Sequence, residues 1–158
     1  MRAGHDRKFL QAVRRGAPLT FHKGLQAIKE GRPRIRARNS SCVLGSANIE
    51  CDCRTKHPNC NLWDYVIGYS RKGEPIAYFV EVHPAGSSNV GEVEKKAVWL
   101  VSFLQEPQNV QLRALRREYH WVASGGIHIP PGTSQYRRLQ KLRGKHDVQG
   151  PTKLLLLT

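Results

Sequence analysis

Two strand-like segments joined by a short turn constrain the fold of this chain more than any other feature. Residues 63–69 and 76–83 are rich in aromatic and β-branched residues, a composition typical of β-strands. Between them lies Gly73, which can adopt the positive φ that a tight turn requires. The pattern predicts a β-hairpin whose second strand stops at Pro84, because proline donates no hydrogen bond to a strand ladder.

The predicted hairpin brings two acidic residues together. With the turn near residue 72 or 73, Asp64 lies opposite Glu81 or within one residue of it, and His83 lies on the same face. Opposed side chains have β-carbons about 4.5–5.5 Å apart, so the two carboxylates repel unless a cation lies between them. The pair therefore indicates a magnesium site, since magnesium prefers oxygen ligands, or a solvent-exposed pair that Arg71, Lys72 or another basic group neutralises.

The remaining pattern predicts one α/β domain with a mixed central sheet of about four or five strands flanked by helices. In a chain of 158 residues we expect a basic amino-terminal arm at 1–19 and a single domain at 20–158. The expected elements are a helix at 21–31 capped by Thr20, a strand at 42–49, a helix at 93–104 ending before Pro107, a strand at 119–129 bent at Gly125 and Gly126, a helical turn at 136–142 and an edge strand at 154–157.

The helix at 93–104 carries a lysine in a distinctive position. At 100° per residue, Lys96 lies beside the apolar stripe of Val93, Ala97 and Leu100, whereas Lys95 points away. We therefore expect Lys96 to face the sheet, where its ammonium group could stabilise charge on a reacting phosphate.

Charge is distributed unevenly along the chain. The net charge is +14; residues 1–40 contain 11 basic and 2 acidic residues, residues 113–158 contain 9 and 2, and residues 41–112 contain 6 and 8. This pattern is typical of a protein that binds nucleic-acid backbone with its flanks, although a ribosome-type, merely solubilising or membrane-surface charge is an alternative. The expected phosphate contacts are Arg32, Arg34, Arg36, Arg38, Arg116, Arg117, Arg137 and Arg138.

The order helix, three strands, helix, strand, with Asp in one strand and Glu-x-His in the next, resembles the PD-(D/E)XK, or restriction-endonuclease-like, nuclease superfamily. The resemblance covers residues 20–129 and implies that Asp64 and Glu81 bind magnesium or manganese as cofactor, with Glu30 as an additional candidate ligand. Trp63 stands where the family's proline is expected, and His83 stands where its lysine belongs. In some members that lysine lies on the following helix, which fits Lys96, with His83 assisting.

A cysteine-rich segment suggests a second metal. Cys51, Cys53, His57 and Cys60 fall within ten residues, and thiolates with imidazole suit tetrahedral zinc. The alternative is a loop with free thiols and no metal. A bound zinc ion would anchor the loop ahead of Asp64.

These features predict a metal-dependent endonuclease that acts on DNA or RNA, with a homodimer as one possible assembly. The alternatives are a non-catalytic nucleic-acid-binding module and a structural protein whose charge aids assembly on a polyanion. Trp63, Tyr65 and Tyr69 fit a hydrophobic core better than a base-stacking platform. The sequence shows no apolar run of about 18 residues and no signal peptide, so we expect a cytoplasmic protein.

Overall fold

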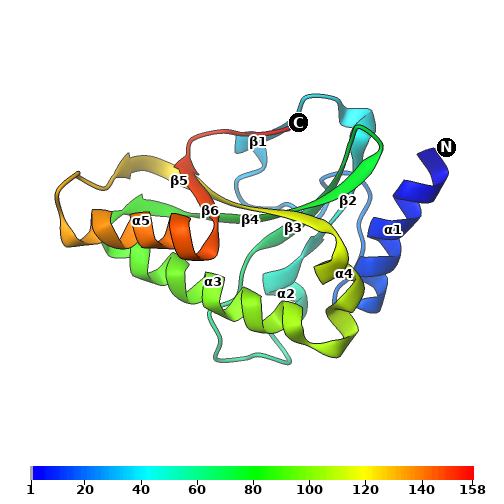
Figure 1. Cartoon of the computed structure of the whole chain (residues 1–158), viewed down its shortest axis with the longest axis horizontal. Coiled ribbons are helices and arrows are strands. Elements are labelled where there is room, and N and C mark those ends of the chain that lie inside the picture. The colour runs from blue at the N-terminus through cyan, green and yellow to red at the C-terminus, as the bar shows by residue number, and fades with distance from the viewer. Residues whose placement is uncertain (1) are drawn as a thin grey trace.

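A mixed five-stranded sheet forms the centre of the protein in the computed structural model, which describes residues 2–158 (Figure 1). Strands β2, β3 and β4 are antiparallel neighbours, and β5 and β6 continue the sheet parallel to β4. The strands span Val43–Asn48 (β2), Tyr65–Arg71 (β3), Glu74–Gly86 (β4), Arg116–His128 (β5) and Val148–Thr152 (β6). The expected α/β class with a mixed central sheet is confirmed.

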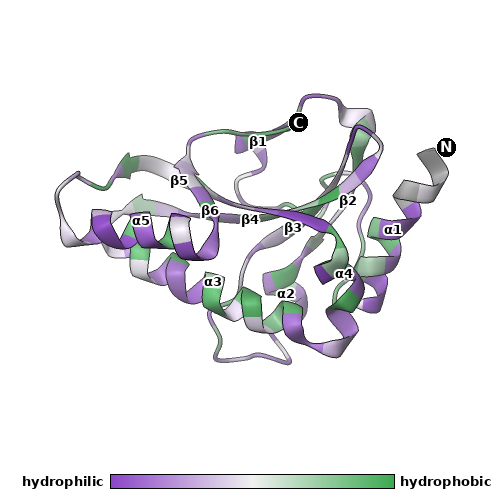
Figure 2. Cartoon of the chain, viewed as in Figure 1, coloured by the Kyte–Doolittle hydropathy of each residue, from purple (hydrophilic) through white to green (hydrophobic). Residues whose placement is uncertain are grey.

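All the helices contribute side chains to one hydrophobic cluster on one face of the sheet, including Phe9, Ile49, Leu100, Leu112 and Leu142. They span Arg2–Arg15 (α1), Ile49–Cys53 (α2), Val90–Gln105 (α3), Val110–Ala114 (α4) and Ser134–His146 (α5). The surface of α5 is largely hydrophilic (Figure 2), and its buried residues are Leu139 and Leu142. None of the helices in residues 2–158 combines the length and hydropathy needed to cross a membrane.

The opposite face of the sheet is covered by chain segments without α-helix. A small parallel sheet pairs β1 (Ile35–Ala37) with β7 (Leu155–Leu157). Its residues pack with Ile28, Tyr65 and Val82 in a second hydrophobic cluster.

Single 3₁₀ turns span Arg32–Arg34, Ser40–Cys42, Ser87–Asn89 and Pro107–Asn109.

The predicted hairpin and its register are confirmed. Arg71 pairs with Glu74, and the two turn residues between them have positive φ: 50° at Lys72 and 81° at Gly73. Such a two-residue turn with two positive φ values matches the right-handed twist of the strands. Along the ladder Tyr65 pairs with Val80. Asp64 precedes Tyr65 and Glu81 follows Val80, so the two carboxylates lie at the same level.

The predicted end of the second hairpin strand is wrong. β4 continues past Pro84 to Gly86, and its register against β5 shifts between His83 and Ala85. At this irregularity the missing N–H of Pro84 is not needed for the ladder. The strand at 119–129 is confirmed in β5, and the register shift falls opposite its Gly125 and Gly126.

Two expectations for the first forty residues are corrected by the structure. Residues 2–15 form helix α1, which buries Phe9 and Val13 in the core, so this segment is not a free arm. Residues 21–31 contain no helix. Part of their backbone bonds to β2 instead, because His22 pairs with Ser46 and the Ala27 N–H donates to the Ser46 hydroxyl.

The remaining expectations are confirmed in part. Strand β2 and helix α3 match the predicted 42–49 and 93–104 segments. The expected turn at 136–142 is the longer helix α5, and the expected edge strand at 154–157 is β7, which pairs with β1 rather than with the central sheet. The sequence did not indicate α4 or β6.

Truncation of Phe9 tests the role of α1. A Cβ placed on Gly68 of β3 would lie 2.5 Å from the Phe9 ring, so the helix packs directly on the sheet backbone. We expect Phe9→Ala to lower the free energy of unfolding by about 3–5 kcal/mol, measured by urea denaturation. Arg7→Ala, an exposed neighbour on the same helix, is the control. Equal stability of both variants would contradict the packing of α1.

Candidate active site

Asp64, Glu81 and Lys96 meet beneath helix α3. Asp64 lies just before β3, Glu81 lies in β4, and Lys96 lies in the second turn of α3. The Lys96 Nζ donates to Glu81 Oε1 at 2.9 Å and Oε2 at 2.8 Å, and lies 3.8 Å from Asp64 Oδ1. The Val82 N–H donates to Asp64 Oδ2 at 2.9 Å, which fixes the orientation of that carboxylate. The prediction that Lys96 faces the sheet is confirmed.

These charges are removed from solvent. The side chain of Glu81 is 0% exposed, that of Asp64 is 8% exposed and that of Lys96 is 18% exposed. The alternative of a solvent-exposed carboxylate pair is wrong, because both carboxylates are buried. Their basic partner is Lys96 rather than Arg71, which instead binds Glu118 at 2.8 Å. A buried carboxylate requires a counter-charge or a proton, and Lys96 supplies the counter-charge.

One ammonium group does not fully compensate the carboxylates. Burial raises the pKa of Asp64 to about 7, with Lys96 acting in the opposite direction. Burial and the charge of Asp64 together raise the pKa of Glu81 well above its usual range. Burial acts to lower the pKa of Lys96, but the charges of Glu81 and Asp64 outweigh it and the pKa rises. Burial is the largest cause of both carboxyl shifts, and the charge of Lys96 does not outweigh it.

A third carboxylate, Glu50, joins this site, and the sequence did not indicate it. Glu50 lies in the first turn of α2, where the N–H groups of Ile49 and Glu50 donate to the Asp64 carbonyl. Its negative charge raises the pKa of both Asp64 and Lys96, and it also pairs with the exposed Arg54. No local pattern signals this contact, because Glu50 lies fourteen residues before Asp64 in the chain.

His83 lies beside this cluster, and a further carboxylate, that of Glu92, holds its imidazole ring. Its Nε2 lies 2.5 Å from Glu92 Oε2, and the Asn89 side-chain amide donates to the same oxygen at 3.2 Å. The hydrogen bond with His83 lowers the pKa of Glu92, which keeps that carboxylate charged. The Trp121 indole donates to the His83 carbonyl at 3.2 Å. Glu92 lies one helical turn before Lys96, so α3 supplies partners for both Glu81 and His83.

Glu30 does not lie on a helix and is not brought to this site. It is exposed in the turn before Gly31, and its N–H donates to the Tyr65 hydroxyl at 3.0 Å. A Cβ on Gly31 would contact the Val82 side chain at 2.7 Å. Tyr65 and Val82 belong to the cluster on the face opposite α3, so Glu30 is separated from Lys96 by the sheet.

The four residues of the expected zinc site have different environments. Cys53 is buried in the core, and burial raises the pKa of its thiol to about 12, whereas Cys51 and Cys60 are exposed. His57 packs edge-on against Trp99 at 5.5 Å, and its Nε2 lies 3.7 Å from Glu106. Among the side chains that the structure describes, no three His, Cys, Asp or Glu residues are grouped to hold a metal ion.

The expected phosphate-binding arginines lie in three separate places. Those at 32–38 lie in and around β1, Arg116 and Arg117 lie at the start of β5, and Arg137 and Arg138 lie in α5. Several already have partners: Arg32 donates to the Leu25 carbonyl, and Arg138 binds Glu94 at 3.0 Å beside the first turn of α3. Trp63, Tyr65 and Tyr69 are all buried, as expected for core residues.

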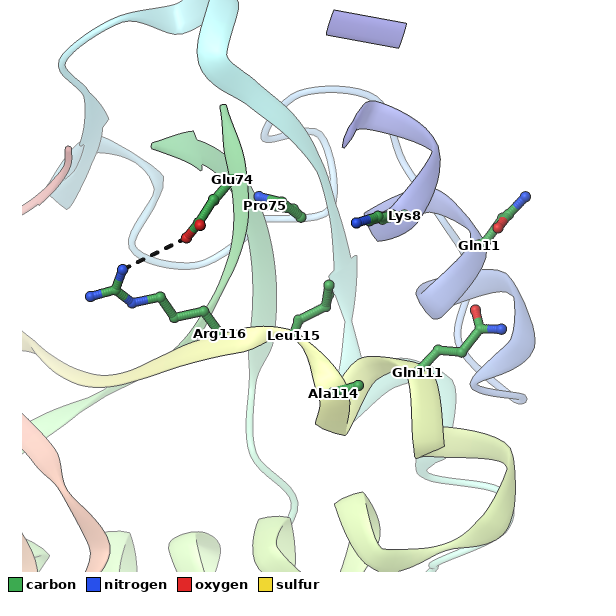
Figure 3. A pocket seen from close by; sticks show the side chains of 8 residues that line it. All are labelled: Lys8, Gln11, Glu74, Pro75, Gln111, Ala114, Leu115 and Arg116. Carbon is green, nitrogen blue, oxygen red and sulfur yellow. Dashed lines mark ion pairs between the residues drawn. The ribbon is translucent and has the colours of Figure 1, made fainter. Parts of the chain in front are cut away.

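A surface groove of about 610 Å³ is lined by the residues drawn in Figure 3. None of them is Asp64, Glu81 or Lys96. The groove runs between α1, α4 and the turn end of the hairpin, and Lys8, Gln111 and Arg116 are among its lining residues. Glu74 of this groove lies seven residues from Glu81 along β4, roughly 20 Å at the usual rise per residue. The groove carries no buried ionisable cluster, so it is a candidate contact surface rather than the centre of chemistry.

Comparison with known proteins adds no further constraint, because no protein family, no curated protein and no solved structure matches this chain. The functional conclusion therefore depends on the geometry of the site.

The raised pKa of Asp64 predicts how the free energy of unfolding changes with pH. Between about pH 4 and pH 7 the folded protein retains a proton at Asp64 that the unfolded chain has lost, so stability falls as pH rises through this range. Asp64→Asn has no proton to lose, and its amide oxygen can still accept from Val82. We expect the variant to gain stability relative to the wild type from pH 4 to pH 7, by on the order of a few kcal/mol, with no further gain above pH 7.

Urea denaturation of both proteins at several pH values measures this difference. Glu74→Gln, which changes a carboxylate that is 68% exposed, should show a much smaller change across the same range. A stability difference between Asp64→Asn and wild type that stays constant with pH would contradict the assignment.

Proposed function

We propose that this protein is a metal-dependent endonuclease of the restriction-endonuclease-like fold that hydrolyses the phosphodiester backbone of DNA or RNA. The observation that carries the proposal is the buried cluster of two carboxylates and one ammonium group, formed by Asp64 just before β3, Glu81 of β4 and Lys96 of α3. The chain that holds this cluster has a net charge of +14. The hairpin, the following helix and the parallel strand β5 occur in the order that the resemblance implies.

The donor set suits magnesium or manganese. Asp64 and Glu81 present hard carboxylate oxygens, and Glu50 acts on them through its charge. A divalent cation at these oxygens would favour their charged forms and so offset the burial that raises the pKa of both carboxyls. When bound, such a cation would polarise the scissile phosphate and lower the pKa of a water molecule.

Lys96 and His83 have roles that follow from their own contacts. The Lys96 ammonium group can move from Glu81 to the phosphate oxygens, where it would stabilise the negative charge that develops during hydrolysis. Glu92 fixes the Nε2 side of the His83 imidazole, which leaves Nδ1 as the nitrogen that can accept a proton from water. Glu92 is thus a positioning residue for His83.

The basic surfaces supply binding to the substrate. Arg137 and Arg138 of α5 lie on the same side of the sheet as the carboxylates, whereas Arg32 to Arg38 and the start of β5 would hold backbone at other surfaces, including the groove with Lys8 and Arg116. Binding of this kind weakens steeply with added salt, because it depends on release of counterions.

The same geometry supports a second candidate function, a nucleic-acid-binding protein without catalysis. Lys96 donates to both oxygens of Glu81, a stable arrangement that neutralises the carboxylate without a metal. In that case the fold would serve as a scaffold for the basic surfaces, and the buried ion cluster would be structural.

Cleavage assays separate the two functions. We expect purified protein to cut plasmid DNA, structured DNA or RNA with magnesium or manganese and to be inactive with EDTA. Glu81→Gln and Lys96→Met should each lower the rate by at least about 100-fold, since each removes a charge needed in the transition state. Lys95→Met, which removes the exposed neighbouring lysine, should cut at the wild-type rate.

Binding measured on the same preparations completes the test. Salt-sensitive binding in every variant without cutting in any of them would reject the nuclease and favour the binding module. Full activity of folded Glu81→Gln would reject the site.

A further inference from the structure

The small parallel sheet of β1 and β7 has one buried face and one exposed face. Ile35 pairs with Leu155, and both lie in the second hydrophobic cluster, which packs on the central sheet. The next pair along the ladder is Arg36 with Leu156, and both of these residues are exposed. Because side chains alternate between the two faces of a strand, Arg36 and Leu156 lie on the outer face of the small sheet. This face lies across the central sheet from α3 (Figure 1).

The outer face carries a row of arginines beside a row of leucines. Arg38 follows Arg36 by two residues, and its N–H donates to the Leu157 carbonyl at 2.9 Å, so the same alternation brings Arg38 to the outer face. Leu154 comes two residues before Leu156, and these leucines are 49% and 48% exposed. Residues two apart in a strand are separated by about 6.6 Å, and neighbouring strands by about 4.8 Å. The cationic row and the apolar row therefore run side by side.

The cations of this face have no acidic partners. Residues 23–49 and 148–158 together contain seven basic residues and one acidic residue, Glu30. No ion pair between side chains that the structure describes includes Arg34, Arg36, Arg38 or Lys153. Arg34 donates to the Lys153 backbone carbonyl at 3.4 Å, which holds a third arginine beside the two strands without neutralising its charge. These guanidinium groups can bind phosphate, which their planar fork matches in geometry.

A single nucleic-acid strand is complementary to both rows. Its phosphates form a linear series of negative charges, and its unpaired bases expose faces that contact apolar side chains. A duplex keeps its base faces stacked inside, so it would bind the arginines and leave the leucines without an apolar partner. An anionic membrane fits less well, because even a whole myristoyl chain gives only marginal membrane binding, and these two leucines are already half covered.

We propose that the outer face of the β1–β7 sheet is a second nucleic-acid-binding surface, which holds a single strand with its phosphates on Arg36 and Arg38 and its bases against Leu154 and Leu156. The central sheet separates this face from Lys96, so a phosphate held here is not the phosphate at the carboxylate cluster. The inference goes beyond the proposed function, because binding at this face requires neither a metal ion nor cleavage.

Equilibrium binding with EDTA present tests this surface without cleavage. The full-length protein is titrated into labelled oligothymidine, oligouridine and a hairpin duplex, and fluorescence anisotropy is measured at several salt concentrations. We expect Arg36→Gln/Arg38→Gln to bind the single strands at least about ten-fold more weakly at about 0.1 M salt, with a smaller loss for the duplex. Each phosphate contact on a single strand contributes about 0.7 to the slope of log K against log salt, so this slope should fall by about 1.4.

Matched variants separate this face from general charge and general apolar surface. Lys56→Gln/Lys95→Gln removes two exposed cations elsewhere, so it controls for net charge and should bind the single strands within about three-fold of wild type.

Leu154→Ser/Leu156→Ser should weaken single-strand binding about five-fold and leave duplex binding unchanged, since only unpaired bases reach the leucines. Val98→Ser, at a valine that is 51% exposed on α3, should change neither. Circular dichroism checks that each variant is folded. If the leucine variant is unfolded, the comparison of single strand with duplex in the arginine variant still provides the test.

The outcomes distinguish this surface from the nuclease site. Unchanged single-strand binding in Arg36→Gln/Arg38→Gln would overturn the proposal even if the protein cuts, and so would an equal loss of single-strand and duplex binding. Sedimentation with phosphatidylserine vesicles that is lost in the same variant, while single-strand binding is kept, would assign the face to a membrane instead. Single-strand binding that is retained in Glu81→Gln and weakened in the arginine variant would support the surface even if no cleavage is found, in which case the nuclease proposal alone would fail.

Discussion

The buried carboxylate of Glu81 requires a counter-charge, and this requirement fixes helix α3 against the central sheet. Glu81 is fully buried in β4, and its two oxygens both accept from Lys96 of α3. The hairpin register brings Asp64 to the same level, and α2 adds Glu50. The sheet, α2 and α3 are therefore held in one relative arrangement by charge as well as by apolar packing. Any change in the hairpin register would leave a charged group buried without a partner.

Stability alone does not explain this arrangement. Replacing a buried ion pair by apolar residues of similar volume is often neutral or stabilising, because burial of each charge is costly. Here the cost is increased by a second carboxylate at the same level and a third nearby, which raise the pKa of their neighbours. Ionisable groups held in such a state cluster at functional sites more often than elsewhere. The surrounding features are consistent with function, since His83 is fixed by Glu92 of the same helix that carries Lys96.

The sequence contained the central part of this site but not its surroundings. The Gly73 turn and the strand pattern determined the hairpin register, and the helical period of α3 correctly placed Lys96 on the side of the helix that faces the sheet. The helix α1 was missed because its many charges mask a narrow apolar stripe of Phe9, Ala12 and Val13. A helix was wrongly expected at 21–31, because apolar spacing does not reveal that His22 and Ala27 bond to Ser46 of β2. Glu50 depends on a tertiary contact between α2 and Asp64, which no local pattern reports.

Binding of a divalent cation at the buried carboxylates is the central claim, and calorimetric titration with manganese tests it most directly. Because the pKa of Asp64 is raised to about 7, a cation that binds there must displace protons below that pH. Titrations at pH 6.5 in two buffers with different ionisation enthalpies should show one site and proton release on binding, with loss of both in Glu81→Gln. Absence of binding at millimolar manganese, or binding that is unchanged in Glu81→Gln and releases no protons, would contradict the account.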